Sequence, residues 1–210
     1  MTQQSSDLAD LVILVPDRDT EAAVKGILSR PQALGIREIG STIFTHIERD
    51  PGCFKRSHDF LRPMINTYKH ALVIFDRAGC GQEPKGRETI ERIVEKNLSI
   101  SGWENRAAAV VIDPELEVWV WSDSPEVANC LGWEPGLADL RKWLTDRGLW
   151  PRYARKPVDP KLAVEQVLRQ LKKPRSSAVY KLLAQRVSFE RCIDPAFSKF
   201  KAVMQKWFGR

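Results

Sequence analysis

The sequence predicts an α/β protein built on a doubly wound, mostly parallel sheet, with a C-terminal helical appendix. Three short segments are continuous apolar runs, which is typical of strands buried on both faces of a sheet, and a fourth alternates and is rich in β-branched residues. Segments with helical spacing of apolar residues separate them, as expected for strands joined by crossover helices. The predicted strands span residues 11–15, 41–47, 71–75 and 107–112.

Between and beyond these strands, apolar residues recur at helical spacing. The first helix should have Asp19 or Thr20 as its N-cap, because either side chain can accept a backbone hydrogen bond. Residues 50–57, which contain a Pro-Gly pair, are expected to form a loop before a short helix over residues 59–68. The remaining predicted helices span residues 88–101, 124–131, 135–147, 161–172, 176–186 and 196–208.

The segment that follows the fourth predicted strand has two interpretations. Asp113 as N-cap and Pro114 at the first helical position favour a helix, whereas the β-branched and aromatic residues behind them favour a strand. We expect a helix. Under either interpretation, Glu115 and Glu117 lie just beyond the carboxyl end of a strand.

Charge is distributed unevenly along the chain. The net charge is +6, but residues 151–210 hold 15 Lys and Arg against 4 Asp and Glu, whereas residues 1–150 hold 18 against 23. We therefore expect an α/β domain over residues 1–150 and a basic helical appendix over residues 151–210, joined by a proline-rich segment. The positive excess favours a polyanionic partner such as nucleic acid, although a solvated helix face has the same composition.

Composition disfavours several classes of protein. The chain is 43% hydrophobic and 29% charged. No apolar run approaches the about 20 residues of a membrane span, and the polar residues 1–10 do not match a signal peptide. We therefore expect a cytoplasmic protein with no membrane partner. The cysteines and histidines are scattered, so neither a zinc site nor a disulfide framework is expected.

Acidic residues follow three of the predicted strands. Asp17 and Glu21 follow the first strand, Asp76 the third, and Glu115 and Glu117 the fourth. Because the carboxyl ends of parallel strands lie at one edge of the sheet, we expect these acids to converge on one crevice. A buried acid needs a positive partner, which can be a metal ion, a basic side chain or backbone N–H groups. Helix and turn capping would equally account for each acid taken alone.

Three short motifs occur in order along the chain. They are Asp17, Thr20 and Glu21 after the first strand, then Phe75-Asp76-Arg77-Ala78-Gly79, then Pro114-Glu115-Leu116-Glu117-Val118-Trp119. Together they resemble the TOPRIM-like proteins of prokaryotic defence islands, and most of all the small TOPRIM-like subunit of the methylation-associated defence system. The C-terminal residues, with Tyr180-Lys181 and Ser188-Phe189-Glu190, are similar to the tail that follows such domains.

The resemblance implies an acidic crevice that binds Mg²⁺ or Mn²⁺ and acts on nucleic acid by phosphoryl transfer within an antiphage defence complex. A divalent cation held by carboxylates would neutralise the charge that builds on a phosphate. Ala78 occupies the position of the second metal-binding aspartate of such domains. The predicted site residues are Asp17 and Glu21 for proton transfer, Asp76, Glu115 and Glu117 for the metal, and Lys172, Lys173 and Arg175 for phosphates.

A second hypothesis is a degenerate, non-catalytic TOPRIM-like subunit that serves assembly, sensing or nucleic-acid binding with other subunits of the defence system. Arg77 and Ala78 beside Asp76 favour it, because the arginine can neutralise the acid. Four tryptophans would suit a protein interface if exposed, or the core if buried: Trp103, Trp133, Trp150 and Trp207. A third hypothesis, nucleotide binding by the glycines after Asp76, lacks a Walker or dinucleotide pattern.

Overall fold

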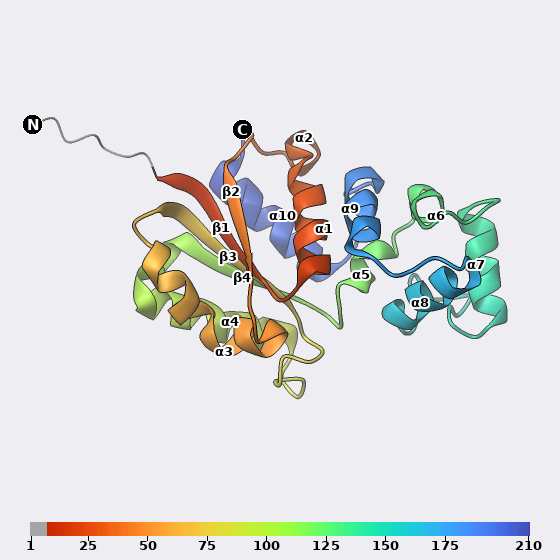
Figure 1. The fold of residues 1–210 in the computed structure, drawn as a ribbon, viewed down its shortest axis with the longest axis horizontal. Coiled ribbons are helices and arrows are strands. Elements are labelled where there is room, and N and C mark those ends of the chain that lie inside the picture. The colour runs from red at the N-terminus through yellow and green to blue at the C-terminus, as the bar shows by residue number, and fades with distance from the viewer. Residues whose placement is uncertain (1–7) are drawn as a thin grey trace, which may run out of the picture.

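The computed structural model describes residues 8–210 and has an α/β fold with a four-stranded, all-parallel sheet (Figure 1). The strands are β1 (Ala9–Val15), β2 (Ser41–Thr45), β3 (Tyr68–Asp76) and β4 (Ala107–Ile112). Their order across the sheet is β2-β1-β3-β4. Because parallel neighbours need crossover connections, helices join the strands. The predicted doubly wound parallel sheet with C-terminal helices is confirmed.

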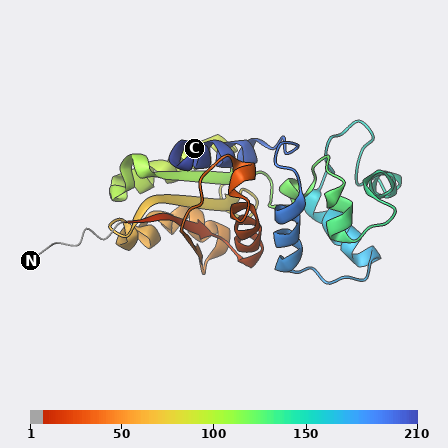
Figure 2. The same cartoon turned by 90° about the horizontal axis from the view of Figure 1, so that it is seen from above.

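Helices cover both faces of the sheet (Figures 1 and 2). The α-helices of the described residues are α1 (Arg18–Leu28), α2 (Pro31–Leu34), α3 (Arg49–Leu61), α4 (Arg87–Leu98), α5 (Glu117–Val120), α6 (Glu126–Leu131), α7 (Leu137–Asp146), α8 (Pro160–Gln170), α9 (Ser177–Arg186) and α10 (Pro195–Phe208). Of these, α6, α7 and α8 lie beyond the end of the sheet and cover neither face (Figures 1 and 2). In residues 8–210, no helix combines the length and apolar character needed to cross a bilayer.

Alternate side chains of each strand enter two separate cores, as the pleat of a strand requires. Leu11 and Ile13 of β1 pack in a cluster with buried residues of α1 and α10. Val12 and Leu14 of the same strand pack in a second cluster, with buried residues of α3 and α4. Continuous apolar runs in the sequence are therefore the mark of a sheet covered on both sides.

The chain beyond residue 150 shares the first of these cores. α9 packs along α1, and α10 packs beside β4. Phe200 and Met204 of α10 are fully buried in the cluster that contains the strand residues. Buried side chains from residues 8–150 and from residues 151–210 thus belong to one hydrophobic cluster. The division into two domains at residue 150 stays a prediction.

The exposed edge of β4 is closed by side chains rather than by another strand. The backbone N–H groups of Ala109 and Val111 donate to Glu95 Oε1 at 3.1 Å and to Glu91 Oε1 at 3.0 Å. Lys199 of α10 then lies 3.2 Å from Glu91 Oε2 and 2.7 Å from Glu95 Oε1. Buried backbone N–H groups need hydrogen-bond acceptors. The two glutamates of α4 supply them, and Lys199 links α10 to the same glutamates beside β4.

The predicted loop over residues 50–57 and the predicted helix over residues 59–68 are both wrong. A single helix, α3, spans Arg49–Leu61, and Tyr68 already belongs to β3. α3 tolerates Pro51 because this residue lies in the first turn of the helix, where backbone N–H groups have no helical partner. Gly52 is required for a tertiary reason: a Cβ there would lie 2.0 Å from Nδ1 of His46.

The first helix begins earlier than predicted. Its N-cap is Asp17, not Asp19 or Thr20, and the Asp17 side chain accepts a 2.9 Å hydrogen bond from the backbone N of Thr20. Asp17 has the extended backbone that an N-cap needs, with φ of −157°. The strand therefore passes into the helix with only two intervening residues.

The segment after β4 is helical, as expected, but the helix starts later than predicted. α5 begins at Glu117, and Asp113 is not its N-cap. The carboxylate of Asp113 is held instead by Arg77, whose Nε lies 2.8 Å from Asp113 Oδ1. An ion pair with the loop after β3 thus replaces the predicted cap.

The tryptophans considered for a protein interface belong mainly to the core. Trp103, Trp133 and Trp150 are buried. Trp207 is partly buried and stacks on His70, with ring centroids 4.5 Å apart. These side chains therefore supply packing area to the protein itself.

Gly26 lies at a close contact between α1 and α9. A Cβ at this position would lie 2.7 Å from both Ala184 Cβ and the backbone oxygen of Lys181. We expect Gly26→Ala to lower the free energy of unfolding by about 1–3 kcal/mol, because overpacking outweighs the about 1 kcal/mol that alanine gains in helix propensity. Denaturant unfolding measures the change. Gly40→Ala is the control, since its Cβ would meet nothing within 4 Å; an unchanged Gly26→Ala protein would contradict the close packing.

Candidate functional site

A cleft of about 830 Å³ lies at the carboxyl edge of the sheet. Its walls come from the segments that follow the four strands and from the C-terminal helices. Four of the acids predicted to converge do line it: Asp17, Asp76, Glu115 and Glu117. The parallel arrangement explains this, because every strand delivers its next residues to the same edge.

Asp76 ends β3, and the Oδ1 atom of its side chain is buried in the wall of the cleft. Its Oδ1 atom has no hydrogen-bond partner among the described residues. Burial raises the pKa of Asp76 well above the usual 3.8, the neighbouring Asp50 raises it further, and a backbone hydrogen bond from Leu116 offsets part of the rise. Arg77, the partner considered from the sequence, pairs with Asp113 instead. Asp76 is thus a buried acid that lacks a basic partner of its own.

Asp50 is the site residue that the sequence analysis missed. It lies in the first turn of α3 and lines the cleft. Its Oδ1 accepts a 2.8 Å hydrogen bond from the backbone N of Asp76. Burial raises the pKa of Asp50, and Asp17 and Glu115 add to the rise. The rule that placed acids after the other strands applies to β2 as well, but residues 50–57 were expected to form a loop.

Asp17 and Glu21, the residues predicted for proton transfer, have different positions. Asp17 lines the cleft, although one of its carboxylate oxygens already caps α1. Glu21 does not line the cleft, and it forms an ion pair with Lys25 one turn along the same helix. Glu21 therefore has the role of an ordinary surface residue in the first turns of a helix.

Glu115 and Glu117 are each neutralised by a basic residue from the C-terminal part of the chain. Glu115 pairs with Lys161 of α8. Glu117 is only 2% exposed, and it accepts a 2.7 Å hydrogen bond from the hydroxyl of Tyr180. Its Oε1 also lies 3.0 Å from Arg175. A metal ion that used either glutamate would have to replace an existing ion pair.

Arg175 is part of this acidic cleft rather than of a free basic surface. Its guanidinium lies 3.1 Å from Asp19, 3.0 Å from Glu117 and 3.5 Å from Glu165. Because three carboxylates surround its guanidinium, Arg175 forms ion pairs within the protein although it is partly exposed. This role ties the segment between α8 and α9 to the ends of β1 and β4.

The other two residues predicted for phosphate contact lie outside the cleft. Lys173 donates a 3.0 Å hydrogen bond to the backbone oxygen of Leu131, and Lys172 is exposed. Within the cleft, Arg18 and Arg49 are exposed and form no ion pair with any residue in the range 8–210. Two arginines that could contact a phosphate therefore line the same cleft as the acids. Neither was among the residues predicted for phosphate contact.

The donor set of the cleft fits one kind of cation site. In the described part of the chain, no three acidic, histidine or cysteine side chains lie close enough to hold a metal ion together. Mg²⁺ does not need such a cage, because it keeps several waters and is bound through one or two carboxylates plus phosphates of a ligand. Asp76 and Asp50 supply two neighbouring carboxyl groups, and the buried oxygen of Asp76 has no partner within residues 8–210.

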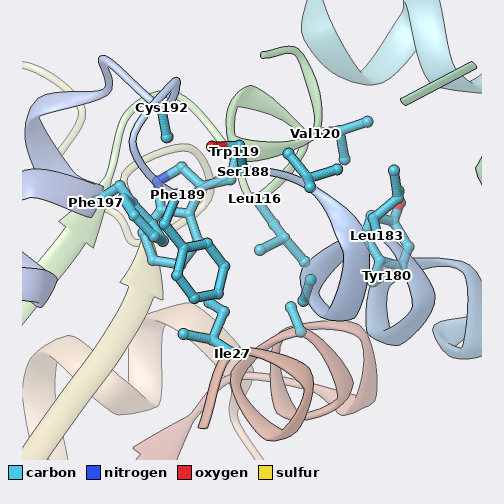
Figure 3. Close-up of a pocket in the computed structure, with 13 residues that line it drawn as sticks. Ile27, Leu116, Trp119, Val120, Tyr180, Leu183, Ser188, Phe189, Cys192 and Phe197 are labelled. Atoms are coloured by element: carbon cyan, nitrogen blue, oxygen red, sulfur yellow. The ribbon is translucent and has the colours of Figure 1, made fainter. Parts of the chain in front are cut away.

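A second cavity behind the cleft is apolar and much smaller. It holds about 50 Å³ and is lined from α1, α5, α9 and α10, by residues such as Ile27, Leu116, Tyr180 and Phe197 (Figure 3). This volume is too small for a substrate, and the apolar lining offers few hydrogen-bond partners to a water molecule. We attribute the cavity to imperfect packing where the helices meet.

Comparisons with protein-family models, with curated proteins and with solved structures find no match to this chain. The structure establishes an α/β fold with a four-stranded parallel sheet. The resemblance to TOPRIM-like proteins stays a prediction from the motifs.

Removing the guanidinium of Arg175 should destabilise the protein, because it leaves the buried Glu117 without a cationic partner. We expect Arg175→Ala to lower the free energy of unfolding by about 1–3 kcal/mol. The loss is smaller than for a fully buried ion pair because Arg175 is partly exposed. The double variant Arg175→Ala/Glu117→Gln should recover part of the loss, since the amide keeps a bond to Tyr180 without a charge. Lys172→Ala is the matched control and should be neutral in the same denaturant unfolding assay. A fully stable Arg175→Ala protein would refute this role.

The raised pKa of Asp76 predicts a pH-dependent stability. Below the pKa of the unfolded chain the carboxyl is protonated in both states, and the stability it contributes is complete; that contribution is lost as the pH rises through the folded-state pKa. In metal-free buffer with a chelator, Asp76→Asn should therefore be more stable than the wild type at high pH, with the difference shrinking toward acid pH. Thermal unfolding across pH measures this, and a difference that is constant with pH would contradict it.

Proposed function

We propose that the cleft at the carboxyl edge of the sheet binds a divalent cation together with a phosphate-bearing ligand. In this proposal the protein is a TOPRIM-like component of a prokaryotic antiphage defence system that acts on nucleic acid by phosphoryl transfer. The observation that supports it is the buried Oδ1 of Asp76, which lacks any partner in the described chain although a second carboxylate lies beside it. A carboxylate buried in this way is costly unless a positive group meets it.

The residues of the cleft have distinct roles in this proposal. Asp76 and Asp50 hold the cation, which would neutralise negative charge on a bound phosphate. Arg18 and Arg49 are exposed at the same cleft and contact phosphate oxygens. Asp17 lines the cleft and is the proton acceptor, in place of Glu21, which lies outside it. Glu115 and Glu117 hold Lys161 and Arg175 in position.

A non-catalytic subunit is the second candidate, and specific contacts favour it. Glu115 and Glu117 are both occupied by ion pairs, and Asp17 serves as a helix cap. Acids satisfied in this way stabilise a fold without any chemistry. Such a subunit would serve assembly, sensing or nucleic-acid binding in the defence complex.

Cation binding tests the proposal directly. Titration of the metal-free protein with Mn²⁺ or Mg²⁺ should release heat in calorimetry and raise the unfolding temperature, with about 2.7 kcal/mol of added stability at a hundredfold excess over Kd. Asp76→Asn should abolish both effects. Glu21→Gln is the control, because Glu21 is an acid that follows another strand but does not line the cleft. This variant should leave both effects unchanged. No heat and no thermal shift in folded wild-type protein would remove the cation site.

Cleavage of labelled DNA and RNA in Mn²⁺ separates the two candidate functions. The catalytic proposal predicts hydrolysis by the wild type and its loss in Asp76→Asn. Cation binding without any difference in cleavage between these two proteins would leave the non-catalytic subunit as the function.

A further inference from the structure

A second large groove lies away from the sheet, between the segment after α5 and the loop that joins α7 to α8. It holds about 800 Å³. Its floor includes Trp121 and Trp150, which are buried and meet edge to face with ring centroids 5.4 Å apart. None of the acids of the carboxyl-edge cleft lines it. The groove is thus a separate feature of the molecule.

The rim of this groove presents a tyrosine to solvent on a fixed turn. Tyr153 is 93% exposed although it is a large aromatic residue. The turn that carries it is closed by a 3.0 Å hydrogen bond from the backbone N of Ala154 to the oxygen of Pro151. The oxygen of Ala154 also accepts hydrogen bonds from Trp150 Nε1 at 2.9 Å and from Arg141 at 3.0 Å. The ring is therefore held out by a turn that is anchored to α7.

Basic residues outnumber acidic ones in the lining of the groove. Arg141, Arg155, Lys156 and Arg191 line it, against the single acid Asp123, and of the four only Lys156 forms an ion pair among the described residues, with Asp194 at 3.7 Å. Arg155 is exposed and makes no hydrogen bond or ion pair with other residues of the described range. A basic groove with an exposed, pre-positioned aromatic ring matches how proteins bind unpaired nucleic-acid strands, where bases stack on aromatic side chains and basic residues follow the backbone.

We propose that this groove binds single-stranded nucleic acid, with Tyr153 stacking on a base and Arg155 contacting a phosphate. A duplex hides the faces of its bases, so it cannot use the exposed ring, whereas an acidic peptide would use the charges alone. The proposal does not rest on the cation site. It also places nucleic-acid contact away from Lys172, Lys173 and Arg175.

Fluorescence anisotropy tests this proposal with labelled oligothymidylate and oligouridylate of about 12 nucleotides, within the usual range of site sizes. All titrations contain EDTA, so a failure of the cation site would not affect them. Tyr153→Ala should weaken binding at least about fivefold through lost stacking, and Tyr153→Phe should restore it. Arg155→Ala should reduce the slope of log affinity against log salt by about 0.7 for one lost phosphate contact.

Matched controls separate the groove from the rest of the surface. Lys55→Ala and Lys172→Ala each remove an exposed lysine that lies outside the groove, so both should bind as the wild type does. Comparing the affinities for oligothymidylate and oligouridylate shows whether the groove prefers DNA or RNA. The proposal is overturned if the wild type does not bind, if Tyr153→Ala binds equally well, or if a duplex or an acidic peptide binds as tightly as the single strands.

Discussion

The candidate cleft depends on one electrostatic constraint, the proximity of two partly buried carboxyl groups where β3 ends. The backbone N–H of Asp76 is held by Asp50, so the second acid cannot move away without breaking a hydrogen bond to the sheet. Burial raises the pKa of both acids, Asp50 raises that of Asp76 further, and Asp17 and Glu115 add to the rise at Asp50. The wall of the cleft therefore keeps an electrostatic cost that only a proton or a cation can relieve.

Much of this arrangement could be predicted from local sequence. The continuous apolar runs identified three of the strands, and parallel strands necessarily bring Asp17 and Asp76 to one edge. Asp50 was missed because a proline and a glycine next to it favour a loop. The glycine is explained by packing rather than by a turn, because the ring of His46 lies where a side chain at Gly52 would be. The hydrogen bond that ties Asp50 to Asp76 joins residues 26 positions apart, and such a contact has no signal in a local window.

The partners of the acids could not be predicted either. Glu115 and Lys161 are separated by 46 positions in sequence, and Tyr180 follows Glu117 by 63. Spacing within one helix can indicate an ion pair, but pairing between distant segments depends on how the helices dock. The basic C-terminal region was expected to face a polyanion, and part of its charge is instead used inside the protein, by Lys161 and Arg175. Charge totals therefore overestimate how much positive surface remains free.

The closed edge of β4 has a consequence for association between molecules. An open strand edge can recruit a strand from another chain, which is a route to domain swapping and to fibrils. Here Glu91 and Glu95 occupy the outward amides of Val111 and Ala109, and Lys199 screens those carboxylates. An intermolecular sheet could form only through the opposite margin, at β2. Because a polymer needs two open edges per molecule, association by this route would stop at a dimer.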